Sequence, residues 1–145
     1  MTRRNPTEKD VKFKGKTLLE KYGWFHWSPP ANTFGASGIA DLHAVHQSVF
    51  MVVEFKFGGN KPTALQKGFL TTIQAAGHFA FVVNDTNMDY FEAFLGAFAR
   101  ATTGVQKGGE KGVDPNDGSI LLNSIHELTK DYMNFEDQAK KASLN

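Results

Sequence analysis

With 145 residues, the chain is long enough for one domain with a single hydrophobic core. Its hydrophobic (41%) and charged (21%) fractions are ordinary for globular proteins, and its net charge of +1 argues against a protein that coats nucleic acid through charge alone. The absence of cysteine excludes disulfides and thiolate metal sites and agrees with a reducing cytoplasm. No apolar run reaches about 18 residues, so we expect no membrane span. The basic N-terminal residues are followed by no apolar stretch, so we expect no secretory signal either.

The first predicted element is a helix over residues 8–22. Thr7 has the short polar side chain of a helix N-cap, and Gly23 is typical of the position after a helix end. One face carries an apolar stripe. Its members are Val11, Gly15, Leu18, Leu19 and Tyr22. Glu8 lies at the start of this face, whereas Glu20 projects from the other side of the helix.

Three short strands should follow. Residues 24–27 are β-favouring, and 39–46 and 49–57 flank a two-residue turn. The last of these, VFMVVEFKF, is the strongest strand pattern in the chain. Trp24 and Trp27 are large residues in a short strand, so we expect them mostly in the core, although either could stack on a base.

A crossover comes next in the chain. Residues 63–76 form a helix that Pro62 opens and Gly77 ends, and 78–83 (HFAFVV) form a buried strand. A strand, a helix and a strand over this length predict a right-handed crossover between parallel neighbours. The fold class is therefore α/β, with a mixed four-stranded sheet flanked by helices in the order αβββαβ.

The rest of the chain should add helices to the same domain. We expect helices over 87–103 and 119–141, joined by a flexible loop over 104–118. The first of them is aromatic around most of its circumference, through Tyr90, Phe91, Phe94 and Phe98. Such a helix must bury more than one face. We therefore predict that a second subunit covers part of it, unless the C-terminal helix does so.

Two carboxylates should meet in the hairpin formed by the second and third strands. If the turn is symmetric, Asp41 lies opposite Glu54, with Cβ atoms about 5 Å apart, and Lys56 points to the same face. Two carboxylates at this distance repel unless a cation lies between them. Oxygen ligands favour Mg²⁺ or Mn²⁺, and a nearby lysine suits phosphodiester hydrolysis. A merely structural ion pair would be costly in so apolar a strand.

The order of these residues resembles a known nuclease pattern. Glu8, then Gly38-Ile39-Ala40-Asp41, then Glu54-Phe55-Lys56, then Gln66 in the next helix resemble the PD-(D/E)xK series. More narrowly, they resemble the VRR-NUC branch found in phages and in DNA-repair enzymes. The resemblance covers residues 7–83 and implies a restriction-endonuclease-like core, with residues 84–145 as additional helices of a single domain spanning 1–145.

This resemblance implies a role for each matched residue. Asp41 and Glu54 would bind the metal, with the Phe55 carbonyl oxygen as a further ligand. Glu8 would contribute from the first helix, as a catalytic residue or a further metal ligand. The chain departs from the pattern at Ala40, where many relatives have proline; alanine still permits an extended backbone there.

The remaining candidates surround these ligands. The resemblance implies that Lys56 acts on the attacking water and the phosphate, and that Gln66 holds the site geometry or a water. Lys61 and Lys67 are candidate contacts to the DNA backbone. His43 shares the strand face of Asp41, where it either assists the site or is a partly buried surface histidine.

Together these patterns predict a Mg²⁺- or Mn²⁺-dependent DNA endonuclease. The resemblance implies branched substrates such as Holliday junctions and, because cutting two strands needs two sites, a homodimer. It would work in the cytoplasm, that of a host cell if it is phage-encoded. A flap endonuclease, a nickase, an exonuclease, a catalytically silent DNA-binding module and a structural protein remain alternatives. Residues 1–67 carry ten Lys/Arg against five Asp/Glu, which agrees with a DNA-facing half.

Overall fold

The computed structural model describes residues 4–30 and 38–109. The elements in chain order are α1 (Glu8–Lys21), β1 (Phe25–Trp27), β2 (Leu42–His46), β3 (Val49–Phe55), α2 (Ala64–Ala75), β4 (Phe79–Val83) and α3 (Met88–Gly109). This is the αβββαβ order that the sequence predicts, followed by one further helix. The helix expected over 119–141 lies outside the described residues. No helix in the described part of the chain is long and apolar enough to cross a membrane.

The four strands form one mixed sheet in the order β1-β2-β3-β4. The first two pairs of neighbours are antiparallel, and β3 and β4 are parallel, as the predicted crossover requires. The hairpin register is also confirmed, because Leu42 lies opposite Val53 and His46 opposite Val49. Between them Gln47 and Ser48 have φ angles of 47° and 67°. Positive φ at both central residues is what a tight two-residue hairpin turn needs.

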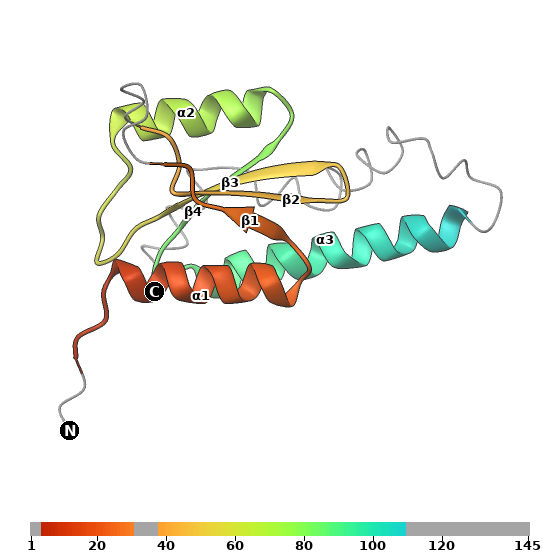
Figure 1. The fold of residues 1–145 in the computed structure, drawn as a ribbon, viewed down its shortest axis with the longest axis horizontal. Coiled ribbons are helices and arrows are strands. Elements are labelled where there is room, and N and C mark those ends of the chain that lie inside the picture. The colour runs from red at the N-terminus through yellow and green to blue at the C-terminus, as the bar shows by residue number, and fades with distance from the viewer. Residues whose placement is uncertain (1–3, 31–37, 110–145) are drawn as a thin grey trace.

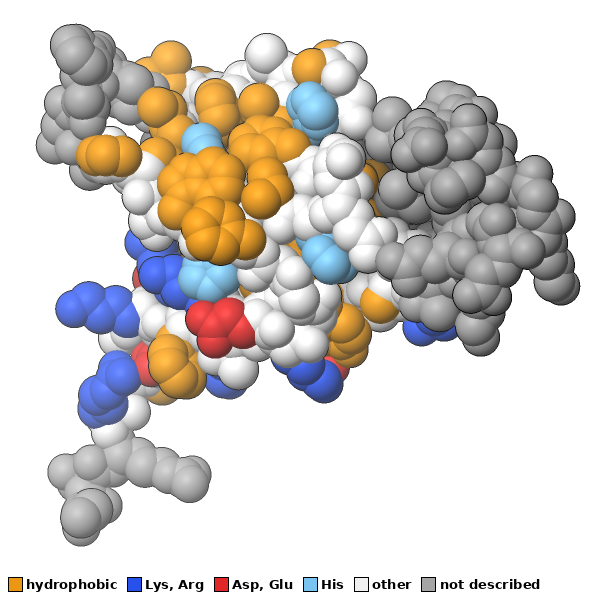
Figure 2. Space-filling view, turned by 45° about the vertical axis from the view of Figure 1, so that its right-hand side comes forward, with side chains coloured by type: hydrophobic (Ala, Val, Ile, Leu, Met, Phe, Trp, Pro, Cys, Tyr) orange, Lys and Arg blue, Asp and Glu red, His pale blue; other side chains and the backbone are white. Residues whose placement is uncertain are grey.

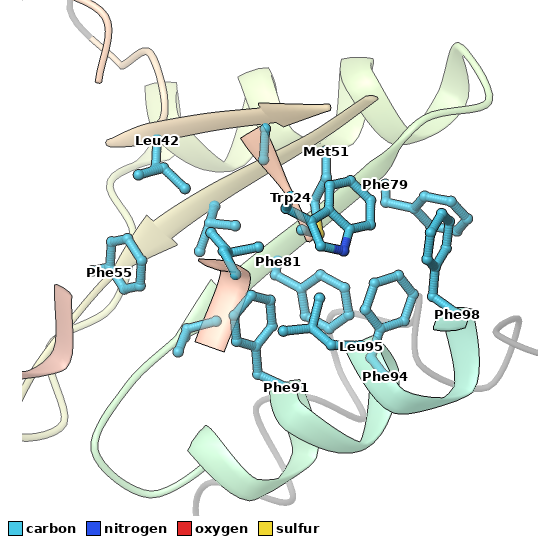
Figure 3. Close-up of a cluster of buried hydrophobic side chains, with 14 of the residues drawn as sticks. Trp24, Leu42, Met51, Phe55, Phe79, Phe81, Phe91, Phe94, Leu95 and Phe98 are labelled. Carbon is cyan, nitrogen blue, oxygen red and sulfur yellow. The ribbon is translucent and has the colours of Figure 1, made fainter. Parts of the chain in front are cut away.

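Helices cover both faces of the sheet: α2 lies on one face, and α1 and α3 lie on the other (Figure 1). Strand β3 divides its side chains between them, as the period of two requires. Met51, Val53 and Phe55 point into the larger core under α1 and α3, shown in Figure 3. Val52 packs in a smaller cluster with Leu70 of α2. The side of the sheet under α2 is therefore the side on which Glu54, two residues after Val52, must lie.

The aromatic helix differs from the sequence prediction in two respects. It continues to Gly109, so the loop expected from residue 104 is wrong at its start, because one glycine costs a helix about 1 kcal/mol without ending it. Residues 110–118 lie outside the described part. Phe91, Phe94 and Phe98 are at most 1% exposed and belong to the core of this chain. Their burial needs no second subunit, because the phenylalanines of β4 receive them; the Phe81 and Phe94 rings are 4.6 Å apart.

The two tryptophans have different environments. Trp24 is 3% exposed and packs in the core, as expected. The same expectation for Trp27 is wrong, because its side chain is 38% exposed. Trp27 belongs to β1, which is an edge strand, and α2 packs over β3 and β4 instead.

Candidate functional site

Two carboxylates meet at one end of the β2–β3 hairpin. Asp41 immediately precedes β2, and Glu54 is the last but one residue of β3. The backbone N–H of Asp41 donates to Glu54 Oε2 at 3.1 Å. The backbone N–H of Phe55 donates to Asp41 Oδ2 at 2.9 Å. These two hydrogen bonds hold the carboxylates side by side, in the arrangement that the hairpin register predicts.

Glu54 is buried although it is acidic. It is 1% exposed, and burial, followed by the neighbouring charge of Asp41, raises its pKa to about 7. Lys56 acts in the opposite direction, with its Nζ 3.4 Å from Glu54 Oε1. The Glu54 pKa stays raised although Lys56 lies beside Glu54 and Lys12 Nζ lies 3.4 Å from Asp41 Oδ1, because Glu54 has lost contact with water next to a second carboxylate. A further cation at this place would therefore stabilise the ionised form of Glu54.

Gln66 connects this carboxylate to the start of α2. Its side-chain Oε1 accepts from the backbone N–H of Thr63 at 2.9 Å, and the backbone N–H of Gln66 donates to Thr63 Oγ1 at 3.2 Å. Because the carbonyl oxygen of the side chain is used in this cap, the amide NH₂ is directed at Glu54, where it donates to Oε1 at 2.8 Å. The same residue thus caps the start of the helix and holds one oxygen of the Glu54 carboxylate.

The first turns of α1 reach the site from the other side. Lys12 Nζ lies 3.4 Å from Asp41 Oδ1 and 3.7 Å from Glu8 Oε1, so the Lys12 ammonium bridges the two carboxylates. Glu20 instead pairs with His26 at 3.2 Å. Glu8 therefore lies on the side of α1 that faces Asp41, with Lys12 between them. Lys12 is not among the site residues that the sequence predicts, although its position four residues after Glu8 places both on one side of the helix.

Two glycines allow these elements to approach closely. A Cβ at Gly15 in α1 would lie 2.7 Å from Cζ of Phe55, so the helix could not pack this near to β3 with any other residue unless the ring moved. Gly38 has a φ of 97°, and a Cβ there would lie 2.7 Å from Leu65 Cβ. It lets the chain pass the first turn of α2 just before Asp41.

The remaining sequence candidates, Lys61, Lys67 and His43, are not brought into contact with the carboxylates by any hydrogen bond or ion pair seen among the described residues. Lys61 precedes α2, Lys67 follows Gln66 on it, and both are exposed. His43 is partly buried, and its ring stacks on Phe69 with centroids 6.2 Å apart. Its Nε2 has no hydrogen-bond partner within the described residues, and burial lowers its pKa. It is thus a partly buried histidine of an aromatic cluster.

The donor set at the carboxylates fits a hard divalent cation. Among residues 4–30 and 38–109, no three Asp, Glu or His side chains converge as a ready-made metal cluster. Mg²⁺ does not require one, because it usually keeps several waters and binds through one or two carboxylates. Asp41 Oδ1 already faces a positive charge, the ammonium of Lys12 at 3.4 Å.

A scan against protein-family models finds no match to this chain, and a search of the curated proteins finds none either. The function must therefore be inferred from the residues themselves. Two adjacent carboxylates, one of them buried, and two lysines at the same edge of a sheet form the kind of site that can bind a divalent cation and a phosphate together.

Proposed function

We propose that the protein is a metal-dependent DNA endonuclease with a restriction-endonuclease-like core, which hydrolyses phosphodiester bonds with Mg²⁺ or Mn²⁺. The observation that carries this proposal is the contact between Asp41 and buried Glu54, with Lys56 beside them. Without a cation the ionised form of Glu54 is disfavoured, because burial and the charge of Asp41 raise its pKa to about 7. A merely structural role accounts poorly for such a pair.

Within the proposed site, the carboxylates of Asp41 and Glu54 would hold the metal, and the Phe55 carbonyl oxygen is a further candidate ligand. A bound Mg²⁺ supplies Lewis-acid polarisation of the phosphate and lowers the pKa of a water. The protein contributes rigidity, because both carboxylates are fixed by backbone N–H groups and one also by the amide of Gln66. Preorganised ligands of this kind need little rearrangement during the reaction.

The lysines supply the positive charge that a phosphate needs. The side chain of Lys56 is 14% exposed and lies against Glu54, so its ammonium is held at the site, where it can orient the attacking water and donate to a phosphate oxygen. Lys12 adds a second ammonium on the opposite side of Asp41. We propose that Glu8 acts through the position of this lysine or as a further ligand.

The proposed substrate is branched DNA, as the resemblance to small stand-alone VRR-NUC proteins implies. The described part of the chain holds one such site, and cutting two strands symmetrically needs two, so we also propose a homodimer. Light scattering at micromolar concentration tests this point. A mass of twice 16.0 kDa supports the dimer, and a mass near 16.0 kDa contradicts it.

The experiment that tests the proposed activity compares four labelled DNAs of matched sequence: linear, nicked, flapped and four-way junction. Each is incubated with Mg²⁺, with Mn²⁺ or with EDTA. Asp41→Asn is the matched control, since it removes a charge and changes the side-chain volume little. Products that require metal and are absent with the variant support the proposal. Cleavage in EDTA, cleavage by the variant, or intact DNA in every reaction of the wild type contradicts it.

A further inference from the structure

A group of aromatic rings, two of them exposed and two partly buried, lies on the sheet face that α2 covers in part. We call Phe25, Trp27, His43 and Phe50 the aromatic surface. Phe25 is 69% exposed and Trp27 38% exposed, and Val45 beside them is 37% exposed. Figure 2 shows exposed hydrophobic side chains gathered in one patch with histidines at its border. Large apolar groups in such a patch usually mark a binding site.

The rings of the aromatic surface support one another. The Trp27 ring centroid lies 5.9 Å from that of Phe25, 5.6 Å from that of His43 and 6.4 Å from that of Phe50. The His43 ring is itself stacked on Phe69 of α2. Trp27 is thus held from several sides while more than a third of it stays exposed. An aromatic ring fixed in this way loses little conformational entropy when a flat ligand stacks on it.

The aromatic surface adjoins the carboxylate pair. In the sheet register Trp27 lies opposite His43, and His43 lies opposite Val52. His43 is two residues from Asp41, and Val52 is two residues from Glu54. Each therefore points to the same face of the sheet as its carboxylate neighbour. One strand spacing and a two-residue rise place the Cα atoms of Trp27 and Asp41 roughly 8 Å apart. A base next to a phosphate at the site can therefore reach the ring.

We propose that the aromatic surface binds unpaired bases adjoining the cleaved phosphate, so that the substrate carries single-stranded nucleotides there, as in a flap, a fork or a gap. This inference rests on the proposed function. In a duplex the faces of each base are covered by its neighbours, so an exposed ring selects bases that are not stacked. Lys12 and Lys56 lie at the carboxylate pair, next to the aromatic surface, where they can bind the phosphates of the DNA backbone. Charge along the backbone combined with aromatic stacking is how proteins hold single strands.

The test measures binding without cleavage. The Glu54→Gln protein is titrated, in EDTA, into a labelled oligothymidylate and, separately, into a labelled blunt duplex of the same length. Fluorescence anisotropy gives the affinity for each DNA. Adding Trp27→Ala should weaken binding of the single strand about tenfold and leave binding of the duplex unchanged, and Trp27→Phe should restore most of the affinity. The matched control is Phe13→Ala, which removes a 72% exposed ring from α1, on the other side of the sheet.

The outcomes separate this inference from the proposed function. Single-strand binding that depends on Trp27, with no cleavage of any DNA, supports the aromatic surface and contradicts only the catalytic proposal. Metal-dependent cleavage with single-strand affinity unaltered by Trp27→Ala overturns the aromatic surface alone. A dimer that Trp27→Ala dissociates would instead assign the surface to a second copy of the chain. Failure of iodide to quench Trp27 in the free protein would likewise overturn the proposal, because the ring would be covered.

Discussion

Replacing Glu54 with glutamine keeps the volume of the side chain and removes the buried charge of the site, so it should change how stability depends on pH. In the wild-type protein without metal, burial and then Asp41 raise the Glu54 pKa from its ordinary value of 4.5 to about 7. The folded protein therefore holds this proton more tightly than the unfolded chain does. The variant has no such proton to lose.

The size of the effect follows from the shift in pKa. Below pH 4.5 the carboxyl is protonated in both states and its contribution to stability is fully present. As pH rises to about 7, the unfolded chain ionises first and the free energy of unfolding falls. At about 1.36 kcal/mol per pKa unit, the total loss is roughly 3 kcal/mol above pH 7. Burial lowers the pKa values of His43 and His46, which acts in the opposite direction in both proteins.

Urea unfolding of wild type and Glu54→Gln in EDTA, from about pH 5 to about pH 8.5, measures this difference. Subtracting the two curves removes the histidines and any pH-independent cost of the hydrogen bonds that glutamine alters. The difference should change by roughly 2.5 kcal/mol across the series, because the unfolded carboxyl is already largely ionised at about pH 5. Mg²⁺ at the alkaline end should then stabilise the wild type and not the variant. Parallel curves would refute the idea that Glu54 is destabilised in the metal-free fold.

Three other substitutions test the surroundings of the pair. Lys56→Ala should lower turnover by about 100-fold or more and DNA binding far less; equal losses would make this lysine a positioning contact. Glu8→Gln should lower activity by at least about tenfold, whereas Glu20→Gln should not. If only Glu20→Gln lowered activity, the side of α1 that carries Glu20, and not the side that carries Glu8, would face the site. Gly15→Ala should lower stability by about 1–3 kcal/mol in chemical denaturation, because its Cβ displaces the ring beneath it; unchanged stability would refute this close packing.

The parts of the site that the sequence predicts depend on local rules. The period of two in a strand and the two-residue turn determine that Asp41 lies beside Glu54, and the structure has this register. The hairpin deduction needs no knowledge of how distant elements pack. Gln66 is expected at the site only from the resemblance, and the structure adds the local reason: as the third residue of α2 it turns back to the N-cap Thr63, which directs its amide at Glu54.

The parts that the sequence does not predict depend on packing between distant elements. Lys12 reaches Asp41 only because α1 lies against the sheet at Gly15. Trp27 is exposed because α2 covers β3 and β4 and leaves the edge strand open, which no pattern within residues 24–27 indicates. The expectation that the aromatic rings of α3 need a second subunit to cover them fails for the same reason. Helix periodicity does not reveal how many rings the facing sheet can accept.

The most direct test of the carboxylate site is the rate of cleavage of one labelled flapped DNA under single-turnover conditions, as Mg²⁺ is titrated into wild type and into Asp41→Asn. We predict that the wild-type rate is zero in EDTA and rises with Mg²⁺ to saturation. The variant should be slower by about 100-fold or more at every concentration, with an unchanged circular dichroism spectrum. A wild-type rate that does not depend on Mg²⁺, or a variant that cleaves as fast as the wild type, would contradict a metal-dependent site built on Asp41 and Glu54.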